Sequence, residues 1–393
     1  MTAGWIFFGL AMSAYAGAAV ALHLGLRRRF PMAAAGGRPS VTVLIAARNE
    51  EHNLPRCLDA LLKNDYPTSQ LEVLVVDDRS TDGTRRVAEE YAQRCSYVRV
   101  LTIRDRLDGM SGKASALCRG MERARGEIVL MTDADCIPPP QWISSMISGF
   151  RSDTGLVGGF TLLAPPPAGS ALQRFWGNIQ NVDWMYLLAV GAGATGLGRP
   201  VSVLGNNCGF RKVAYEAVGG YRALGFSIIE DFALMRAITR QTDWQASFCL
   251  TPGAALETLP PTSWRAFVEQ RKRWAAGARE ISGFGKLLLC VGFLRHAAIF
   301  AAVFLLHPLW PAFVGIGAAF FADFSLLWNA ARRLQRRRAL WYFPWFALYQ
   351  TFYSLVLALV VALPITVRWR DVEYRWRFGG RLRGINDPQT NPS

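Results

Sequence analysis

The stretch LEVLVVDDRSTDGTRRVAEEYAQR, residues 71–94, sets the fold class of this chain. An apolar run rich in valine ends in two aspartates, a turn of Ser, Asp and Gly follows, and the remainder has a helical pattern. Residues 41–47, 98–103 and 127–135 have the same strand character, and helical patterns separate them. Strand–helix alternation implies right-handed crossovers, so the sequence predicts an α/β domain with a mostly parallel, Rossmann-like sheet.

Polar residues follow these strands at their carboxyl ends, where ligands bind in open parallel sheets. They are Arg48, Asn49 and Glu50 after the first strand, Asp77 and Asp78 after the second, and Asp133 and Asp135 after the fourth. The ordinary interpretation is that Asp often ends strands and begins turns. Two carboxylates one residue apart also repel each other, and a divalent cation would offset that repulsion. Mg²⁺ takes one or two carboxylates plus phosphate oxygens, and Mn²⁺ suits similar ligands, so the D-x-D pair indicates a metal shared with a phosphate-bearing substrate.

Gly112 and Lys113 precede a predicted helix that ends near residue 125. Backbone N–H groups at a helix start and a nearby ammonium converge where a phosphate could bind. The stretch is not a Walker A loop, because Leu107 stands where the first glycine should be and Ala114 replaces the Ser or Thr. This difference disfavours a P-loop ATPase.

The N-terminal segment 4–26 has no formal charge over 23 positions. As a helix it is long enough to cross a hydrocarbon core of about 30 Å. A cleaved signal peptide would have basic residues before the apolar stretch, whereas Arg27, Arg28 and Arg29 follow it. We therefore expect an integral protein of a bacterial inner membrane. The positive-inside rule predicts that its N-terminus lies outside and that the next domain lies in the cytoplasm.

Three further apolar segments lie toward the C-terminus. They cover about 286–306, 309–331 and 341–366. Arg295 and Asp323 interrupt the first two, so we expect either that these charges face protein or that one segment lies in the membrane interface. The positive-inside rule predicts that the basic runs at 332–338 and 367–378 both lie on the cytoplasmic side. Three full crossings would put the second of these runs outside, which suggests that one segment does not cross.

The formal net charge of +15 would suit nucleic acid, an anionic membrane or a phosphate-bearing substrate. The arginine clusters at 27–29, 332–338 and 368–383 adjoin the apolar segments, which favours anionic lipid headgroups and disfavours nucleic acid. The seven cysteines form no C-x-x-C pair and have no His at metal-ligand spacing. We therefore expect reduced thiols rather than a disulfide framework or a zinc site.

The order of the motifs over about 240 residues resembles the family-2 glycosyltransferases with a GT-A fold. The matching stretches are VTVLIAARNEE (41–51), VVDDRSTDGT (75–84), GKASAL (112–117), TDADC (132–136), IIED (228–231) and QRKRW (270–274). Together with the apolar segments, the resemblance implies a GT-A domain in the cytoplasm with one N-terminal and two to three C-terminal transmembrane helices. The predicted domains are 1–29, 30–284, 285–367 and 368–393, the last a basic cytoplasmic-type tail.

The resemblance also implies roles for individual residues. A nucleotide-sugar donor, usually a UDP-sugar, would be bound by Ala47, Arg48, Glu50, Asp78, Lys113, Asp133 and Arg273. Asp135 would bind Mg²⁺ or Mn²⁺, and Asp231 would be the general base that takes the proton of the attacking hydroxyl. The acceptor would be contacted by Glu230, Gln270, Trp274, Asn206 and Asn207.

Three of these patterns also have plainer interpretations. Asp231 could be only the N-cap of the helix that it opens. The helix at 263–280 places Gln270, Arg273 and Trp274 on one face, and it could also be a basic amphipathic helix on the membrane through Arg271, Lys272 and Arg279. Residues 170–190 carry an apolar stripe that suits core packing or an interfacial helix that guides a lipid acceptor.

Three functions follow from these observations. The first is inverting, metal-dependent transfer of a sugar, expected to be a hexose from a UDP-hexose, to a lipid acceptor in the membrane, as in the resembling glycolipid glucosyltransferases. The second is a processive polysaccharide synthase of the cellulose or hyaluronan type, which would need more spans or a homo-oligomer to form a channel. The third is an inactive membrane scaffold, which the intact motifs disfavour.

Overall fold

A computed structural model describes residues 2–28, 38–105, 107, 110, 112–165, 168–225, 227, 229–261, 263–278, 280–362, 366–369, 372–376 and 382–386. The chain divides into two compact units, and each is described by itself. The first unit comprises Met1–Ala21, Pro260–Leu326 and the chain from Trp341 onward, and the second comprises Leu22–Leu259 and Leu327–Leu340. The helix with the Q-x-x-R-W motif therefore groups with the apolar segments, whereas the predicted domain limit lies after it; the domain limits stay predictions.

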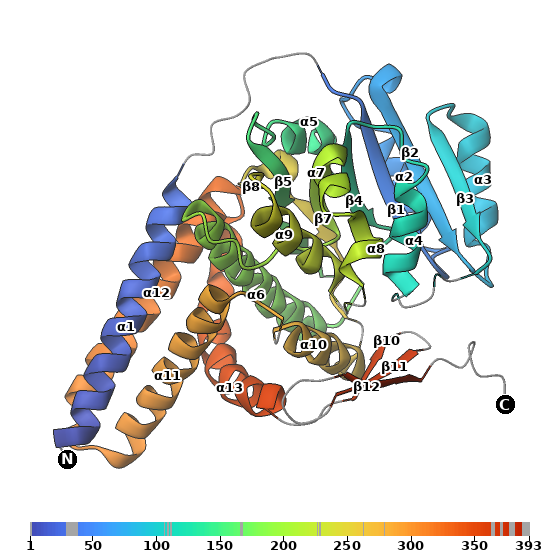
Figure 1. The fold of residues 1–393 in the computed structure, drawn as a ribbon. Helices are drawn as coiled ribbons and strands as arrows, with labels where there is room; N and C mark the ends of the chain where they lie inside the picture. The colour runs from blue at the N-terminus through green and yellow to red at the C-terminus, as the bar shows by residue number, and fades with distance from the viewer. Residues whose placement is uncertain are drawn as a thin grey trace. The chain divides into compact units, whose positions relative to one another are not determined.

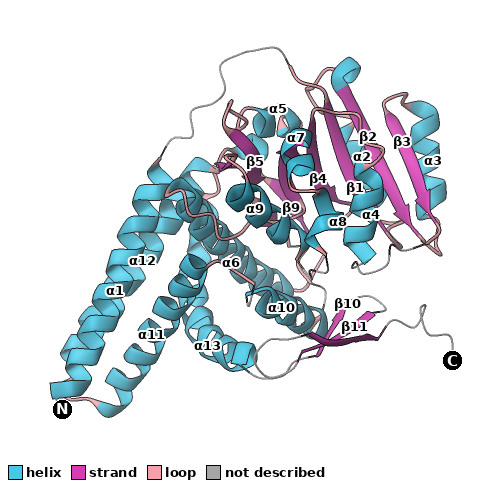
Figure 2. Ribbon diagram, in the orientation of Figure 1, coloured by secondary structure: helices cyan, strands magenta, loops and turns pink. Residues whose placement is uncertain are grey.

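The second unit is built on a sheet that has seven strands in the described residues (Figures 1 and 2). They are β1 (Val41–Ala47), β2 (Leu71–Asp78), β3 (Val98–Ile103), β4 (Ile128–Asp133), β5 (Thr154–Gly159), β7 (Asn207–Arg211) and β8 (Gln245–Cys249). Their spatial order is β3-β2-β1-β4-β7-β5-β8, in which β7 is antiparallel to both neighbours and the other pairs are parallel. The predicted α/β class with a mostly parallel sheet is confirmed.

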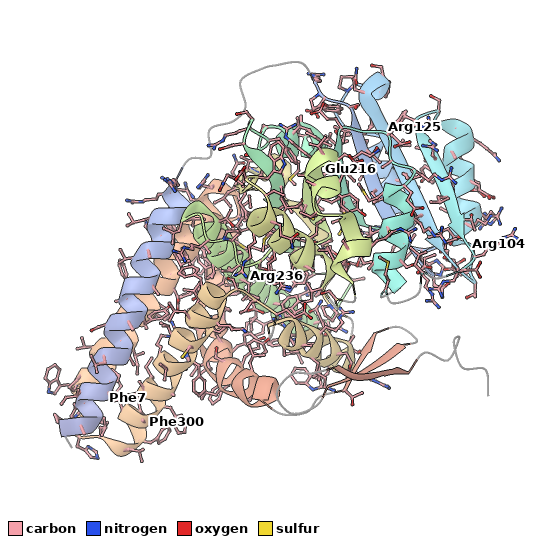
Figure 3. All side chains as sticks on the ribbon, viewed as in Figure 1. Phe7, Arg104, Arg125, Glu216, Arg236 and Phe300 are labelled. Carbon is pink, nitrogen blue, oxygen red and sulfur yellow. The ribbon has the colours of Figure 1, made fainter. Side chains whose placement is uncertain are left out.

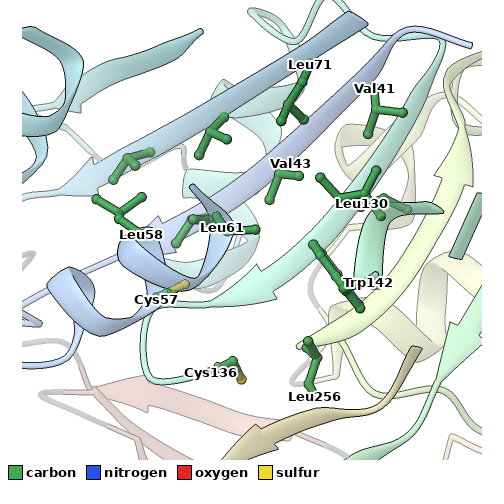
Figure 4. Close-up of a cluster of buried hydrophobic side chains, with 14 of the residues drawn as sticks. Val41, Val43, Cys57, Leu58, Leu61, Leu71, Leu130, Cys136, Trp142 and Leu256 are labelled. Carbon is green, nitrogen blue, oxygen red and sulfur yellow. The ribbon is translucent and has the colours of Figure 1, made fainter. Parts of the chain in front are cut away.

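Helices cover both faces of this sheet (Figure 1). They are α2 (Leu54–Leu61), α3 (Thr84–Arg94), α4 (Gly112–Met121), α5 (Trp142–Ile147), α6 (Ala171–Gly196), α7 (Lys212–Ala217), α8 (Gly220–Leu224) and α9 (Glu230–Gln241), with short 3₁₀ turns at Thr68–Gln70, Pro252–Ala254 and Arg337–Tyr342. Val43 and Ile45 point to one face, where they share a buried cluster with Leu58 of α2 and Trp142 of α5 (Figure 4). Alternate strand residues point to the other face because the side-chain period of a strand is two.

On that other face, α4 approaches β1 and β2 closely. A Cβ added to Gly120 would lie 2.5 Å from Leu44 and 3.0 Å from Val76, so only glycine allows this contact without a shift. This contact packs α4 closely against β1 and β2, and Lys113 lies in the first turn of the same helix.

Helix α6 spans the stretch that sequence analysis interpreted in two ways. Ile179 and Val182 are buried in its middle, as core packing requires. Leu172 and Phe175 in its first turns are 75% and 36% exposed. Beside α6, β6 (Thr161–Leu163) pairs with β9 (Leu256–Thr258) in a small parallel sheet. The core interpretation therefore describes the middle of the helix, whereas its start leaves apolar side chains uncovered in the described structure.

The first unit is helical. It holds α10 (Trp264–Ala278), α11 (Gly283–Leu305) and α13 (Phe343–Ala362), together with most of α1 (Thr2–Arg27) and α12 (Trp310–Arg333). Within the described part of the chain, three helices are long and apolar enough to cross a membrane: Ala3–Arg27, Gly283–Leu305 and Trp310–Arg333. Phe7 and Phe300, which Figure 3 labels, are 44% and 50% exposed on α1 and α11. One N-terminal and two C-terminal candidate spans agree with the sequence prediction.

The charges that interrupt the first two C-terminal segments pair with each other. Nη1 of Arg295 on α11 lies 2.6 Å from Oδ2 of Asp323 on α12, and the Tyr15 hydroxyl on α1 donates to Oδ1 of the same carboxylate. The Arg295 guanidinium also lies 4.2 Å from the centroid of the Tyr15 ring. All three side chains are buried. Of the two expectations, the charges face protein, which removes the objection to both helices as spans.

A three-stranded antiparallel sheet lies in the C-terminal segment. Its described strands are β10 (Thr366–Trp369), β11 (Val372–Trp376) and β12 (Leu382–Asn386). The sequence prediction for this segment was a basic tail without a sheet, and the described strands correct it. The alternation of Val372, Tyr374 and Trp376 with charged residues is the period-two signal that predicts a strand.

Asp323→Leu should lower the free energy of unfolding by about 3–5 kcal/mol, because it leaves the Arg295 charge buried without its carboxylate. The double variant Arg295→Met with Asp323→Leu removes both charges and should recover most of the loss. Thermal unfolding of detergent-purified protein measures both changes. Equal destabilisation by the single and the double variant would mean that the ion pair is not what holds these helices together.

Candidate active site

The carboxyl ends of three parallel strands meet at one edge of the main sheet. Ala47, the last residue of β1, is paired with Asp77 of β2, and Ala46 is paired with Asp133 of β4. This register brings the polar residues that follow the three strands to the same edge. The Ala47 side chain is fully buried, so its backbone is the part that can face a ligand, and Arg48 next to it is half-buried.

The loops after β1 and β2 are tied to each other by hydrogen bonds. Asn49, with a φ of +56°, accepts a bond from the Thr81 N–H through its side-chain oxygen (2.8 Å) and donates its own N–H to the Ser80 hydroxyl (3.1 Å). The Glu50 N–H donates to the Thr84 hydroxyl (2.7 Å). The backbone after both strands is therefore held in place by contacts within the protein.

Asp78 and Arg79 form an ion pair at the end of β2. Arg79 Nε lies 2.8 Å from Asp78 Oδ1 and Nη2 lies 3.3 Å from Oδ2, so the guanidinium meets the carboxylate side on. The Arg79 side chain is only 15% exposed, and that of Asp78 only 7%. A Cβ added to Gly112 would lie 3.7 Å from both Nη2 and Oδ2, which places the pair beside the start of α4. Asp78, which the resemblance assigns to binding of the nucleotide-sugar donor, thus has a cationic partner from its own chain.

Lys113 links the D-x-D pair to α9. Its Nζ lies 2.7 Å from Asp133 Oδ1 and 3.7 Å from Glu230 Oε1. Burial by itself would lower the pKa of Lys113, but the negative charges of Asp133, Glu230 and Asp231 outweigh it and raise the pKa above its usual value. The ammonium is therefore charged at neutral pH and stands between the predicted donor residues and the predicted base.

Asp135 is the carboxylate on which a cation would be bound. Its side chain is exposed to solvent, as a ligand of an incoming ion must be. Desolvation by the surrounding protein, followed by the negative charges of Asp133 and Glu50, raises the pKa of Asp135 to about 6. In the described residues, no three His, Cys, Asp or Glu side chains are grouped as a metal site. The donor set fits Mg²⁺ or Mn²⁺ completed by substrate phosphates, rather than a cage made of protein ligands alone.

Asp231 lies in the first turn of α9 and is not its N-cap. The helix begins at Glu230, and its N-cap position is Ile229, which makes no side-chain capping bond. The Asp231 carboxylate accepts hydrogen bonds from the backbone N–H groups of Phe232 (2.7 Å) and Gly205. A Cβ added to Gly205 would lie 2.8 Å from Asp231 Oδ2, so the loop before β7 sits directly against this carboxylate. The plainer interpretation, that Asp231 only caps a helix, does not describe its contacts.

The pKa of Asp231 is raised to about 7. The cause is first its burial and then the negative charge of Glu230, while the Lys113 ammonium and the two backbone hydrogen bonds oppose the rise. A carboxylate with a raised pKa is a stronger base than an ordinary aspartate. This is the electrostatic property that a general base needs.

The two asparagines of the loop before β7 have different surroundings. Asn206 is half-buried, and its Oδ1 accepts a bond from the Thr161 hydroxyl (2.9 Å). Asn207 is fully buried and makes three bonds within the protein. Its Oδ1 accepts from Trp142 Nε1 (3.0 Å), and its Nδ2 donates to the carbonyls of Phe160 (2.7 Å) and Ala254 (2.9 Å). Asn207 thus holds the loop through its buried hydrogen bonds. The acceptor contact that the resemblance implied for Asn206 and Asn207 stays a prediction.

Helix α10 carries Gln270, Arg273 and Trp274 and belongs to the first unit. The predicted roles of these three residues beside the diphosphate and the acceptor stay predictions. Arg271 was assigned to a membrane-facing surface, but it is buried. Its guanidinium lies 4.5 Å from the Trp274 ring centroid and 5.3 Å from that of Tyr353 on α13. The amphipathic interpretation is therefore wrong for Arg271, which packs among aromatic rings.

Comparison with family models identifies the chain. Residues 6–382 match the model described as "Glycosyl transferase family 21". The chain belongs to this family of glycosyltransferases. The predicted enzyme class is confirmed at the level of the family, and so is the resemblance to glycosyltransferases of the GT-A type.

Two relatives show how far the similarity extends. Glycosyltransferase AglE of Haloferax volcanii is 36% identical over 140 residues, which are 35% of this chain and 44% of that protein. A beta-monoglucosyldiacylglycerol synthase of Nostoc is 28% identical over 243 residues, which are 62% of this chain and 49% of that protein. The chain spans about half the length of the curated relatives it matches.

A solved structure supports the fold. A mannosyltransferase from Pyrobaculum calidifontis, in complex with GDP-mannose and Mn²⁺, superposes with a TM-score of 0.56 at 21% identity. The match covers 90% of this chain and 97% of that one. At this identity the likeness establishes a shared fold and no more.

Sequence reasoning missed the partners that hold the site. Arg79 stands next to Asp78 in the sequence, but nothing in the motif spacing marks it as an ion-pair partner. Trp142 and Thr161 contact the Asn pair from positions 65 and 45 residues away in the chain. A buried Asn with a filled hydrogen-bond set becomes visible only when the strands are assembled.

Asn207→Ala should destabilise the protein by about 2–4 kcal/mol, because it leaves the Trp142 indole N–H and two buried carbonyls without partners. The adjacent Asn206→Ala removes a single half-buried bond and should cost about 1 kcal/mol. Thermal unfolding of the two purified variants compares them directly. Equal stability of the two would show that the buried hydrogen bonds of Asn207 contribute little.

Proposed function

We propose that this protein transfers a sugar, one residue at a time and with inversion, from a nucleotide-sugar to a lipid acceptor in the membrane. The donor is a UDP-hexose, and Mg²⁺ or Mn²⁺ assists. The observation that carries the proposal is the buried Asp231 carboxylate in the first turn of α9, whose neighbour Glu230 shares the Lys113 ammonium with Asp133 of the D-x-D pair. Family membership and the glucosyldiacylglycerol synthase relative support the same chemistry and the same class of acceptor.

The donor would bind at the carboxyl edge of the main sheet. The backbone at Ala47 and the side chains of Arg48, Glu50 and Asp78 would receive the nucleoside, while Lys113 and Asp133 would lie beside the diphosphate. Asp135 would hold the cation, which supplies positive charge to the departing diphosphate when it is bound. The mannosyltransferase of the same fold was solved in complex with GDP-mannose and Mn²⁺, which supports the proposal of a nucleotide-sugar and a divalent metal for this chain.

The acceptor hydroxyl would be activated by Asp231. A sugar or lipid hydroxyl is a weak nucleophile, so Asp231 would take its proton as the oxygen bonds to the anomeric carbon and the bond to the diphosphate breaks. A single base with direct displacement inverts the anomeric configuration. Lys113, whose Nζ lies 2.7 Å from Asp133 Oδ1, would stabilise the negative charge that develops on the leaving diphosphate.

Membrane attachment would bring the enzyme to its acceptor. With α1, α11 and α12 as crossings and the N-terminus outside, the basic run 332–338 lies in the cytoplasm with the α/β unit. The 20-residue α13 would then lie in the interface without crossing, so that the basic tail is also cytoplasmic. This arrangement resolves the conflict in sidedness and leaves the arginine clusters near anionic headgroups. The roles that the resemblance implies for Arg273 at the donor and for Gln270, Trp274, Glu230, Asn206 and Asn207 at the acceptor are part of this proposal.

Asp231→Asn and Asp135→Ala should each reduce sugar transfer to membrane lipids by about 10²-fold or more, since one removes the base and the other the ligand of the cation. EDTA should have the effect of the second variant. The measurement incubates membranes with radiolabelled UDP-sugars and follows label into lipid. Asp153→Asn, an exposed aspartate paired with Arg151, is the matched control and should keep full activity.

Mass spectrometry of the labelled lipid tests the remaining parts of the proposal. Single additions support it, whereas long ladders would point to a processive synthase. No transfer from any donor, with intact folding, would favour an inactive scaffold. Full activity of Asp231→Asn would remove the assignment of the base.

The rate should rise with pH toward a plateau above about 7, because Asp231 acts only when it is deprotonated. Glu230→Gln should move this acidic limb to lower pH, since the Glu230 charge is the main charge that raises the pKa of Asp231. Initial rates between pH 5 and 9 at saturating metal measure the shift. A limb that stays in place in Glu230→Gln would separate the titrating group from Asp231.

A further inference from the structure

We propose that Arg79 makes the nucleotide site select uracil over guanine. This inference rests on the proposed function, because it concerns the base of the nucleotide-sugar donor. It concerns a residue to which neither the motifs nor the comparisons assign a role. The support comes from the backbone of Arg79, from the way its guanidinium meets Asp78, and from the hydrogen-bonding edges of the two bases.

The backbone of Arg79 suggests that its side chain has a use. Its φ is +57°, a left-handed conformation that glycine adopts at lower cost than any residue with a Cβ. The position directly follows β2, where the chain must turn, and a glycine would turn it more easily. Instead the chain places there a long cationic side chain that folds back onto its neighbour and is 15% exposed.

The contact between Arg79 and Asp78 occupies one particular side of the carboxylate. A side-on fork joins Nε to Oδ1 at 2.8 Å and Nη2 to Oδ2 at 3.3 Å. Two parallel N–H donors in this geometry use the lone pairs of the two oxygens that point the same way. The lone pairs that remain on Oδ1 and Oδ2 point away from each other. Asp78 can therefore still accept a single donor on either oxygen, but not two parallel donors.

The two bases differ in just this respect. The edge of uracil that faces a carboxylate carries one N–H donor between two carbonyl oxygens. Guanine carries two adjacent donors, its ring N–H and its exocyclic amino group, which would bind a carboxylate most strongly as a side-on pair. Arg79 already fills that side. Guanine would have to displace the guanidinium, and the displaced charge would lose its carboxylate in a mostly buried position.

Arg79→Gly tests this assignment without straining the fold, since glycine suits the left-handed backbone. Binding of UDP and of GDP to the detergent-purified full chain is measured by calorimetry with Mn²⁺ present. The wild-type protein should bind UDP more tightly than GDP. In Arg79→Gly the ratio of the two affinities should shift toward GDP by about tenfold or more, because the side-on face of Asp78 is open. The ratio is the relevant quantity, since loss of a positive charge weakens both diphosphates alike.

Two further variants sharpen the test. Arg79→Lys keeps the charge but cannot form a planar fork, so its ratio should also shift toward GDP. Arg86→Ala removes an exposed arginine that pairs with Glu90 on α3, and its ratio should stay that of the wild type. An unchanged ratio in Arg79→Gly, or a wild-type preference for GDP, overturns the inference while leaving the proposed transferase intact. Binding of neither nucleotide by folded wild-type protein would instead contradict the proposed function.

Discussion

Mutual repulsion among carboxylates is the constraint around which the edge of the main sheet is arranged. Asp133 and Asp135 come from the end of β4, and Glu230 and Asp231 from the start of α9. The charge of Asp133 helps to raise the pKa of Asp135, and the charge of Glu230 helps to raise that of Asp231. The ammonium of Lys113 stands between the two pairs, at 2.7 Å from one and 3.7 Å from the other. Lys113 lies in the first turn of α4, a helix that packs closely against the sheet at Gly120.

Much of this arrangement could be predicted from the sequence, because it depends on local patterns. The strands at 41–47, 71–78 and 98–103 and the helix at 84–94 have the bounds that their apolar periodicity indicates. The parallel order of these strands then forces their polar ends to one edge. The aspartates of the D-x-D and E-D motifs could be placed near a common site by this logic alone.

The contacts that hold the site could not be predicted in the same way. Asn207 reads as a loop residue in the sequence, and only assembly of β7 against the segments of Trp142, Phe160 and Ala254 fills its hydrogen bonds. The pairing of Arg295 with Asp323 is similar, since in sequence each charge only counts against a membrane span. Both cases depend on residues distant in the chain, for which a single sequence offers no spacing signal.

Lys113 also couples the two halves of the proposed site. The ammonium lowers the pKa of Asp231, in opposition to burial and to the charge of Glu230. A diphosphate bound near Asp133 competes for the same ammonium, because phosphate oxygens and carboxylates attract it alike. Any movement of Lys113 toward such a ligand takes its positive charge farther from Glu230 and Asp231. The negative charge of Glu230 then raises the pKa of Asp231 further. The base would then be strongest when the donor is in place, so that the acceptor hydroxyl is deprotonated when there is a sugar to receive.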